Sequence, residues 1–316
     1  MHKRPIQVYI DGQEGTTGLR LREQLGPLLD RKEVELLLIP PEKRKDAEAR
    51  AAMMESSDAT FLCLPDAAAV EAAELCRDPR VVLFDASTAH RTSPGWAYGF
   101  PELSPEHERA VRESNRIAVP GCHASGFLSL VYPLRAAGIL PADYPLVCYS
   151  LTGYTGGGKN MIAEYEAPDR SPLLDAPRQY GLSQNHKHLR EMVHVANLSR
   201  VPIFAPIVAD FPQGMQTSIP LYADLLSERK TPEEIHAVLA SHYERKGHVH
   251  VLPFGESFDR SFASANLLRD SNELSISVHG NEDRILLLAH FDNLGKGASG
   301  AAVQCLRLRF GLSEDA

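Results

Sequence analysis

Short apolar segments alternate with helical segments along the N-terminal part of the chain. The first of these is Ile6-Gln-Val-Tyr-Ile10, which predicts a strand, and the leucine-rich stretch 19–29 predicts a helix. The same order recurs, with expected strands at 34–39, 59–64 and 81–84 and expected helices at about 44–54 and 66–77. Strands that alternate with helices at this spacing are typical of βαβ units and a parallel sheet. The pattern therefore predicts an α/β domain at the N-terminus.

A glycine loop, Asp11-Gly-Gln-Glu-Gly-Thr-Thr-Gly18, joins the first expected strand to the first expected helix. Its spacing, GxxGxxG, differs from the usual GxGxxG, but its position is the one at which glycines let the backbone approach a pyrophosphate. The helix that follows offers free N–H groups to the same phosphates. We therefore predict a Rossmann-like dinucleotide-binding domain, with cofactor contacts from Gly12, Gly15, Thr16, Thr17 and Gly18.

The segment after the second expected strand, Ile39-Pro-Pro-Glu-Lys-Arg-Lys45, bears on the choice of cofactor. An NAD site commonly places an acid here against the ribose 2′-hydroxyl, whereas this segment supplies three cations. Lys43 and Arg44 are the expected partners of a 2′-phosphate, which favours NADP(H). Glu42 keeps the NAD alternative open.

The segment Pro120-Gly-Cys-His-Ala-Ser-Gly126 sets one cysteine among backbone-permissive residues. A strand is expected at 116–119 and an apolar helical turn at 127–132, so Cys122 falls where a helix begins. A helix N-terminus favours the thiolate, which is the reactive form. Cys122 is therefore the candidate nucleophile, whereas the other cysteines sit in apolar or helical patterns and are expected to be core residues: Cys63, Cys76, Cys148 and Cys305.

A thiolate reaction needs a proton partner, and the best candidates are two histidines in Asn185-His-Lys-His-Leu-Arg-Glu191. His186 and His188 are both retained as catalytic candidates, with Arg190 or Glu191 orienting their surroundings. The spacing does not match a metal-binding motif, and no metal site is expected.

Two further loops are candidate anion sites. The segment 85–91 follows an expected strand, so Ser87, a predicted cofactor contact, and Arg91 should lie at the edge of the sheet where open α/β folds bind ligands. The small-residue loop 153–159 offers backbone N–H groups and a lysine, although a flexible turn explains it equally well. The predicted substrate- and phosphate-binding residues are Arg91, Ser125, Gly157 and Lys159.

Beyond Cys122 the expected strands become longer, at 146–152, 201–208, 215–222, 274–280 and 284–291. They predict a second α+β domain with a mixed sheet, which would carry catalysis and oligomerisation. A terminal helix at 298–310 is expected to return to the first domain. The predicted domains are thus 1–121 with 293–316, which binds NADP, and 122–292.

Composition excludes several other classes of protein. The 316 residues are 43% hydrophobic and 23% charged, as in a globular protein, and a net charge of −8 argues against nucleic-acid binding. Five cysteines without paired spacing favour a reducing cytoplasm. No segment has the length and apolarity of a membrane span or a signal peptide, so no membrane partner is expected.

The chain resembles the short form of the N-acetyl-gamma-glutamyl-phosphate reductases, which are relatives of aspartate-semialdehyde dehydrogenase. The resemblance runs end to end, and five segments carry it: 11–18, 84–91, 120–126, 186–188 and Asp292-Asn-Leu-Gly-Lys-Gly-Ala-Ser-Gly300. It implies reduction of an acyl phosphate to an aldehyde with NADPH in arginine biosynthesis, releasing inorganic phosphate.

The resemblance also implies a role for particular residues. Cys122 would attack the acyl phosphate and hold a thioester, His188 would act as acid and base, and Asn293 and Gly297 would lie beside the nicotinamide. A homodimer or homotetramer is expected. The competing hypotheses are aspartate-semialdehyde dehydrogenase or another phosphorylating aldehyde dehydrogenase, a catalytically inactive dinucleotide-sensing regulator, and a cysteine hydrolase without nicotinamide.

Overall fold

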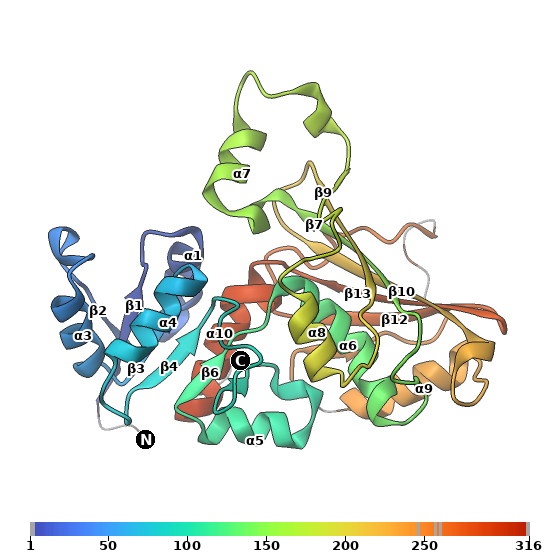
Figure 1. Ribbon diagram of the computed structural model, residues 1–316, viewed down its shortest axis with the longest axis horizontal. Coiled ribbons are helices and arrows are strands. Elements are labelled where there is room, and N and C mark those ends of the chain that lie inside the picture. The colour runs from blue at the N-terminus through green and yellow to red at the C-terminus, as the bar shows by residue number, and fades with distance from the viewer. Residues whose placement is uncertain (1–3, 245–246, 256–257, 259–260, 314–316) are drawn as a thin grey trace. The chain divides into compact units, whose positions relative to one another are not determined.

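The computed structural model describes residues 4–244, 247–255, 258 and 261–313, and the chain divides into two compact units (Figure 1). The first unit comprises Met1–Pro120 and Ala298–Ala316, and the second comprises Gly121–Gly297. The second boundary thus follows Gly297, whereas the sequence analysis placed it before Asn293. The segment 293–297 stays with the second unit because its backbone and side chains bond to that unit.

The first unit is built on a parallel sheet with the strand order β2-β1-β3-β4-β6-β5. Five of its strands correspond to the expected apolar segments, and β5 is a short addition at one edge. The strands are β1 (Ile6–Asp11), β2 (Val34–Leu37), β3 (Ala59–Leu62), β4 (Val82–Asp85), β5 (Ala97–Tyr98) and β6 (Arg116–Ala118).

Alternation along β1 gives this sheet two buried faces. Ile6, Val8 and Ile10 join one apolar cluster, whereas Tyr9 joins a second cluster on the opposite face. Successive side chains of a strand point to opposite faces, so helices are needed on both. The helices in the N-terminal part are α1 (Thr16–Gln24), α2 (Gly26–Asp30), α3 (Ala47–Glu55), α4 (Asp66–Leu75) and α5 (Pro105–Glu113), with 3₁₀ turns at Pro41–Lys43 and Pro101–Leu103.

The single helix expected at 19–29 is wrong in one respect, because the structure has two helices there. Helix α1 ends at Gln24 and α2 begins at Gly26, with Pro27 in its first turn. Proline has no N–H to donate to the preceding turn and fits best in the first turn of a helix. Pro27 therefore divides the leucine-rich stretch.

The C-terminal helix α10 (Gly300–Phe310) follows a π-helical turn at Gly295–Ser299 and belongs to the first unit. Ala302, Val303 and Leu306 pack in the same apolar cluster as β1 and α1. Gln304 Nε2 also donates to Glu102 Oε1 at 2.7 Å. The predicted return of this helix to the first domain is confirmed.

The second unit contains a mixed seven-stranded sheet with the order β11-β12-β13-β10-β7-β9-β8. The pairs β10/β13, β12/β13, β10/β7 and β8/β9 are antiparallel, whereas β7/β9 and β11/β12 are parallel. This confirms the predicted α+β domain with a mixed sheet. The strands are β7 (Val147–Gly153), β8 (Arg178–Gln179), β9 (Ile203–Ala209), β10 (Met215–Tyr222), β11 (Val249–Val251), β12 (Leu274–Gly280) and β13 (Arg284–Phe291).

Helix α6 (Cys122–Ala136) packs on the sheet of the second unit and contacts α8 (Leu189–Val195) and α9 (Pro232–Tyr243). Helix α7 (Gly158–Glu166) lies beyond the ends of β7 and β9 (Figure 1). Short 3₁₀ turns connect these elements at Tyr154–Gly157, Pro172–Asp175 and Ala223–Leu225. Among the helices of the described ranges, none is long and apolar enough to cross a bilayer.

Gly126 allows α6 to lie against the sheet. A Cβ at this position would come within 2.2 Å of Thr217 Oγ1 and 2.8 Å of the Phe291 ring. Thr217 and Phe291 are themselves fully buried, so neither side chain has open space to move into. The glycine therefore fixes the distance between α6 and strands β10 and β13.

We predict that Gly126→Ala lowers the free energy of unfolding by about 1–3 kcal/mol, because overpacking a close-packed interior costs this much. Urea unfolding followed by circular dichroism measures the change. Ala136→Ser, at the exposed end of the same helix, serves as the control and should stay within about 0.5 kcal/mol of the parent. An equal effect of the two substitutions would contradict the close contact.

Candidate functional site

The glycine loop of the first unit has a conformation that requires glycine. Gly12 adopts φ +90°, and a Cβ there would lie 2.3 Å from the carbonyl oxygen of Cys63. A Cβ at Gly18 would lie 2.5 Å from the Gly12 carbonyl oxygen, which accepts a hydrogen bond of 3.0 Å from Gly15 N–H. Backbone of β1, β3 and α1 thus meets closely here.

Helix α1 starts at this loop with Thr16 and Thr17 as its first two residues. Gly15 is the N-cap residue and provides no side chain to cap the helix, and the first turn carries no acidic residue. The positive end of the helix is therefore available to a negatively charged ligand.

A cavity of about 380 Å³ lies beside the glycine loop. Its cationic lining residues are Arg44, Lys45 and Arg50, and Arg44 pairs with Glu14 of the glycine loop at 3.0 Å. Lys43, which the sequence analysis paired with Arg44, is not among the residues that line this cavity. The rest of the lining consists of Tyr9, Ile10, Asp11, Gly12, Gln13, Gly15, Ile39, Leu64, Ala68 and Glu71.

Arg50 is a residue of this cavity that sequence reasoning missed. It is 8% exposed, and its Nη2 donates to Asp11 Oδ2 at 2.8 Å while Nε lies 3.2 Å from both carboxylate oxygens. The available signal was a lone arginine in the alanine-rich stretch 47–52. The ion pair ties α3 to the end of β1, next to Gly12.

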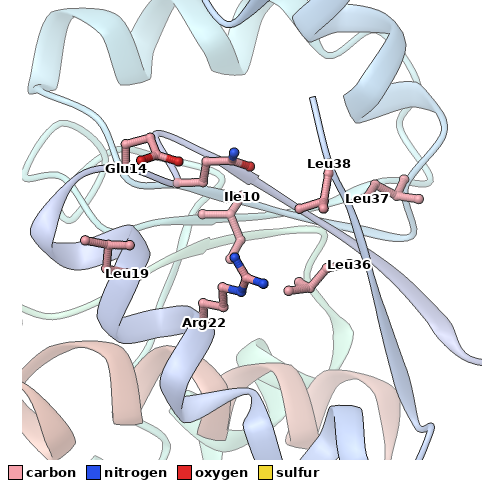
Figure 2. A pocket seen from close by; sticks show the side chains of 8 residues that line it. Ile10, Glu14, Leu19, Arg22, Leu36, Leu37 and Leu38 are labelled. Atoms are coloured by element: carbon pink, nitrogen blue, oxygen red, sulfur yellow. The ribbon is translucent and has the colours of Figure 1, made fainter. Parts of the chain in front are cut away.

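A second and much smaller cavity, of about 30 Å³, is lined by residues of α1 and β2 and shares Ile10, Gln13 and Glu14 with the first. Figure 2 shows Arg22 reaching from α1 toward Ile10 and Leu36, with Leu38 close by. This volume is about that of one water molecule in the liquid. Of the two cavities, only the larger has room for a nucleotide.

The loop after β4 is held together by its own polar groups. Asp85 is fully buried and accepts from the N–H and the hydroxyl of Ser87, both at 2.8 Å, and lies 2.6 Å from His90 Nδ1. Arg91 is buried, and its Nε donates to the Val119 carbonyl at 2.8 Å. These contacts brace the loop against β6, so the observed role of Ser87 and Arg91 includes a structural one.

In the second unit, Cys122 is the first residue of α6, as predicted, and is half-buried. Gly121 is the N-cap residue, and its N–H donates to Glu191 Oε2 at 3.1 Å. A Cβ at Gly297 would lie 2.9 Å from Cys122 Cβ. A buried carboxylate on α8 and a close glycine contact therefore hold the backbone around this cysteine.

Both predicted histidines lie near the start of α8. The His186 and His188 rings are 4.7 Å apart, and the His188 backbone N–H donates to His186 Nδ1 at 3.2 Å. His188 is buried, whereas His186 is half-buried. Because Nδ1 of His186 is committed to a backbone amide, this ring is fixed in place.

His123, which follows Cys122, is a third histidine of this cluster that sequence reasoning missed. Its ring centroid is 5.6 Å from both the His186 and the His188 ring. Nδ1 lies 2.7 Å from Ser150 Oγ, and Nε2 lies 2.6 Å from the Tyr180 hydroxyl. Burial, reinforced by His186, lowers the pKa of His123 to about 3. The ring is therefore neutral at neutral pH.

The remaining predicted site residues of the second unit lie in several different places and make separate contacts. Asn293 is buried, accepts from Gly214 N–H at 2.9 Å and donates to Thr155 Oγ1 at 3.2 Å. The Ser125 hydroxyl donates back to the Gly121 carbonyl at 3.2 Å. Gly157 precedes α7 as its N-cap residue, and Lys159 is exposed on that helix.

The other cysteines differ from Cys122 in their surroundings. Cys76, Cys148 and Cys305 are buried, which confirms them as core residues, and Cys63 is half-buried. Burial, with smaller contributions from Asp11 and Asp85, raises the pKa of Cys63 to about 12, and burial also raises that of Cys148. Within the described part of the chain, histidine, cysteine and carboxylate side chains form no group of three or more that could hold a metal ion.

Comparison with known proteins gives the class first. Residues 12–111 match the family described as semialdehyde dehydrogenase, NAD binding domain, and residues 122–293 match semialdehyde dehydrogenase, dimerisation domain. The fold agrees with aspartate semialdehyde dehydrogenase II from Vibrio cholerae, with a TM-score of 0.72 at 16% identity over 98% of this chain and 99% of that one. An aspartate semialdehyde dehydrogenase from Candida albicans gives a TM-score of 0.67 at 15% identity over 96% and 99%. The class is therefore that of the semialdehyde dehydrogenases.

Two relatives narrow the class further. The chain is 45% identical to an N-acetyl-gamma-glutamyl-phosphate reductase of Chelativorans sp., over 96% of this chain and 97% of the relative. It is 42% identical to N-acetyl-gamma-glutamyl-phosphate reductase 2 of Nostoc sp., over 98% of each chain. The chain belongs to the N-acetyl-gamma-glutamyl-phosphate reductase family of the semialdehyde dehydrogenases.

The depressed pKa of His123 leads to a prediction for stability against pH. Between pH 6.5 and about 3 the unfolded chain binds a proton at this histidine that the folded chain does not, so stability falls as the pH falls through this window. His123→Gln removes the titration and keeps an amide that can hydrogen-bond. We expect the stability difference between parent and variant to shrink by about 2 kcal/mol between pH 7.5 and pH 5.

Urea unfolding at pH 7.5, 6 and 5 measures this difference. His290 is fully buried in both proteins, so its own loss of stability on acidification cancels. A constant difference across the three pH values would show that His123 titrates normally in the folded chain.

Proposed function

We propose that the protein reduces N-acetyl-gamma-glutamyl phosphate to N-acetylglutamate semialdehyde and inorganic phosphate with NADPH, in arginine biosynthesis. The observation that carries the proposal is the full-length similarity to reductases of that name. It is joined by a helix-terminal Cys122, whose neighbour His123 has its ring centroid 5.6 Å from those of His186 and His188. The substrate class is thus a small acyl phosphate.

The proposed cofactor site is the glycine loop and its adjoining cavity. Gly12, Gly15 and Gly18 leave the backbone close to the ligand, and the α1 N-terminus with Thr16 and Thr17 would face the phosphates. Arg44 and Lys45 are the proposed partners of the 2′-phosphate. NADPH, when bound, supplies the hydride that reduces the acyl group. The further proposed cofactor contacts are Ser87, Asn293 and Gly297, whereas Lys43 lies outside the cavity lining.

In the proposed reaction, the Cys122 thiolate attacks the carbonyl carbon of the acyl phosphate. A C–S bond forms, the C–O bond to phosphate breaks, and inorganic phosphate leaves with the bonding electron pair. The product is a thioester that keeps the acyl group in place until reduction. The start of a buried helix supports this role, because its partial positive charge favours the thiolate.

His188 is the proposed acid and base of this reaction. It takes the proton from the Cys122 thiol and gives it to the oxyanion that forms when hydride reaches the thioester carbonyl. It takes the proton back from that hydroxyl as the C–S bond breaks, so that the aldehyde is released and the sulfur leaves as the thiolate. The burial of His188 supports this assignment, and so does the fixed ring of His186, which is committed to a backbone amide. His186 is then the residue that positions His188.

The substrate anion is proposed to contact Arg91, Ser125, Gly157 and Lys159. Lys159, on the exposed side of α7, supplies a long cationic side chain, whereas Gly157 contributes backbone N–H at the start of that helix. Arg91 already donates from Nε to the Val119 carbonyl, so a substrate anion would share this side chain with a structural contact. Arg91 is retained because its guanidinium carries a permanent positive charge.

A homodimer is the proposed assembly, and the family described for residues 122–293 is a dimerisation domain. One face of the second unit's sheet supports it, since Tyr149, Ile203 and Tyr222 are exposed by 50%, 60% and 59%. Exposed large apolar side chains gathered on one surface mark interaction sites. Analytical ultracentrifugation separates a monomer from a dimer and a tetramer.

The activity is tested with the reverse reaction, which needs only a semialdehyde, inorganic phosphate and an oxidised nicotinamide cofactor. A panel of N-acetylglutamate semialdehyde and aspartate semialdehyde, each with NADP and NAD, is expected to give turnover with the first aldehyde and NADP. Preference for aspartate semialdehyde would overturn the proposed substrate, and turnover without phosphate would overturn the acyl-phosphate chemistry.

We predict that Cys122→Ser lowers kcat by about 10³-fold or more, because a serine hydroxyl is far less ionised than a thiol. NADPH affinity, measured by fluorescence titration, should remain within about twofold. The matched control is Cys76→Ser, which replaces a buried cysteine of the first unit whose thiol faces the Asp78 carbonyl. Parent-like turnover by Cys122→Ser would remove the thioester mechanism.

We predict that Arg44→Ala combined with Lys45→Ala lowers the preference for NADPH over NADH by about tenfold or more, because each lost charge-assisted hydrogen bond weakens only the phosphorylated cofactor. Lys43→Ala, outside the cavity lining, is the control and should leave the preference nearly unchanged. The ratio of kcat/KM for the two cofactors is the measurement. A larger effect of Lys43→Ala would return the 2′-phosphate contact to that residue.

A further inference from the structure

A buried arginine of α3 lines the cavity beside the glycine loop and uses only part of its guanidinium within the protein. Arg50 is 8% exposed, and its Nη2 and Nε nitrogens bond to the Asp11 carboxylate at 2.8 and 3.2 Å. Within the described ranges Nη1 makes no hydrogen bond, and its ion pair with Glu71 spans 3.9 Å, which is too long for one. Nη1 is therefore the part of the guanidinium that can donate to a ligand.

Arg50 is held more firmly than the other two cations of the cavity. Lys45 is exposed, and the Arg44 side chain pairs with Glu14, whose own side chain is largely exposed. Long exposed side chains lose rotamer freedom when they bind a ligand. Arg50 is instead fixed by a two-pronged contact to the buried Asp11 at the end of β1. It is therefore the cation that is already oriented before a ligand arrives.

The place of Arg50 in the fold indicates which phosphate of a dinucleotide it would meet. In a Rossmann-like domain the pyrophosphate lies at the glycine loop, where backbone N–H groups and the end of α1 receive it. The adenosine ribose lies beside the carboxyl end of the second strand. Arg50 is in the first turn of the helix that follows this strand, since its N–H donates to the carbonyl of the N-cap residue Asp46 at 3.0 Å. Arg50 is therefore on the side of the ribose and its 2′-phosphate.

The charges of the cavity lining determine what a phosphate must displace. The lining carries as many carboxylates as cations: Asp11, Glu14 and Glu71 against Arg44, Lys45 and Arg50. The Asp11 contact to Arg50 is short and buried, whereas the Glu71 side chain is 63% exposed and lies 3.9 Å from Nη1. Exposed ion pairs contribute little free energy. A phosphate would therefore replace Glu71 at Nη1 and leave the contact to Asp11 intact.

We propose that Arg50 is a specificity-determining residue for the cofactor, with Nη1 donating to the 2′-phosphate of NADP(H). Asp11 holds the guanidinium in place, and Glu71 competes with the phosphate for Nη1. The proposal rests on the proposed function, which places the dinucleotide in this cavity. It adds one buried and oriented cation to Arg44 and Lys45, and it assigns opposite effects on NADP(H) affinity to Arg50 and Glu71.

Calorimetric titration with NADP and with NAD tests the proposal by binding alone, without substrate or turnover. NAD lacks the 2′-phosphate and shares the rest of the molecule, so it is the internal control for every variant. We expect Glu71→Gln to tighten NADP binding by about two- to fivefold and to leave NAD binding unchanged, because the competing charge is lost. Glu74→Gln is the matched control, since it removes the same charge from an exposed position of α4 outside the cavity lining.

Arg50 itself is tested in a double variant, because Arg50→Gln alone would leave the Asp11 carboxylate buried without a cation. Arg50→Gln combined with Asp11→Asn replaces the ion pair by two amides that can bond to each other. We expect this variant to weaken NADP binding by about tenfold or more and NAD binding by less than about twofold, because one charge-assisted hydrogen bond to the phosphate is lost. Asp11→Asn alone keeps the guanidinium and should keep the preference for NADP. Urea unfolding establishes that both variants are folded.

Two results would overturn the proposal. Equal loss of NADP and NAD affinity in the double variant would show that the ion pair only supports the glycine loop. Equal effects of Glu71→Gln and Glu74→Gln would show that Glu71 does not compete at Nη1. Failure of the proposed function gives a different result: a parent protein that binds NADP but has no reductase activity would refute the function, while the ratio of the two dissociation constants would still decide the role of Arg50.

Discussion

The close contact between helix α6 and the mixed sheet is the constraint on which the second unit's site depends. Gly126 lets the helix lie against Thr217 and Phe291. The short distance between helix and sheet at this glycine determines the position of the first turn of the helix. Cys122 and His123 occupy that turn, so their positions follow from packing one helical turn away. A side chain at position 126 would lift the helix and move both residues together.

The site combines a reactive group at the surface of the domain with polar groups in its interior. Burying Ser150, Thr217 and His123 without partners would be costly, and their mutual hydrogen bonds offset that cost. A satisfied buried network is also rigid, because each member has one orientation in which all donors are used. Rigidity of this kind suits a site in which a sulfur must meet a carbonyl carbon in a fixed geometry.

The first unit uses backbone geometry for recognition instead of a side-chain network. The positive φ of Gly12 and the close approach at Gly18 expose backbone where a pyrophosphate would lie, and the Asp11–Arg50 ion pair ties α3 to that point. Arg44 lines the cavity and pairs with Glu14 of the glycine loop. A cofactor phosphate would therefore compete with a carboxylate for the same guanidinium.

Several features were predictable from the sequence because they depend on local pattern. Apolar periodicity and glycine spacing gave the βαβ order and the loop before α1, and small residues around Cys122 marked the start of α6. The break at Pro27 was visible in the sequence but was overlooked in favour of the leucine repeat. Arg50 and His123 carried only weak signals, a lone arginine among alanines and a histidine next to the nucleophile.

The sequence by itself determined the class of each domain and the identity of the candidate nucleophile, because these follow from residue type and short-range spacing. Only the tertiary structure decided which groups surround His123, the residue next to that nucleophile. Tyr180 follows a two-residue strand, and Ser150 and Thr217 are ordinary polar residues of longer strands. They meet His123 because the sheet order β10-β7-β9-β8 and the close packing of α6 on this sheet bring them together. Strand order and burial depend on packing between distant segments, which no local pattern encodes.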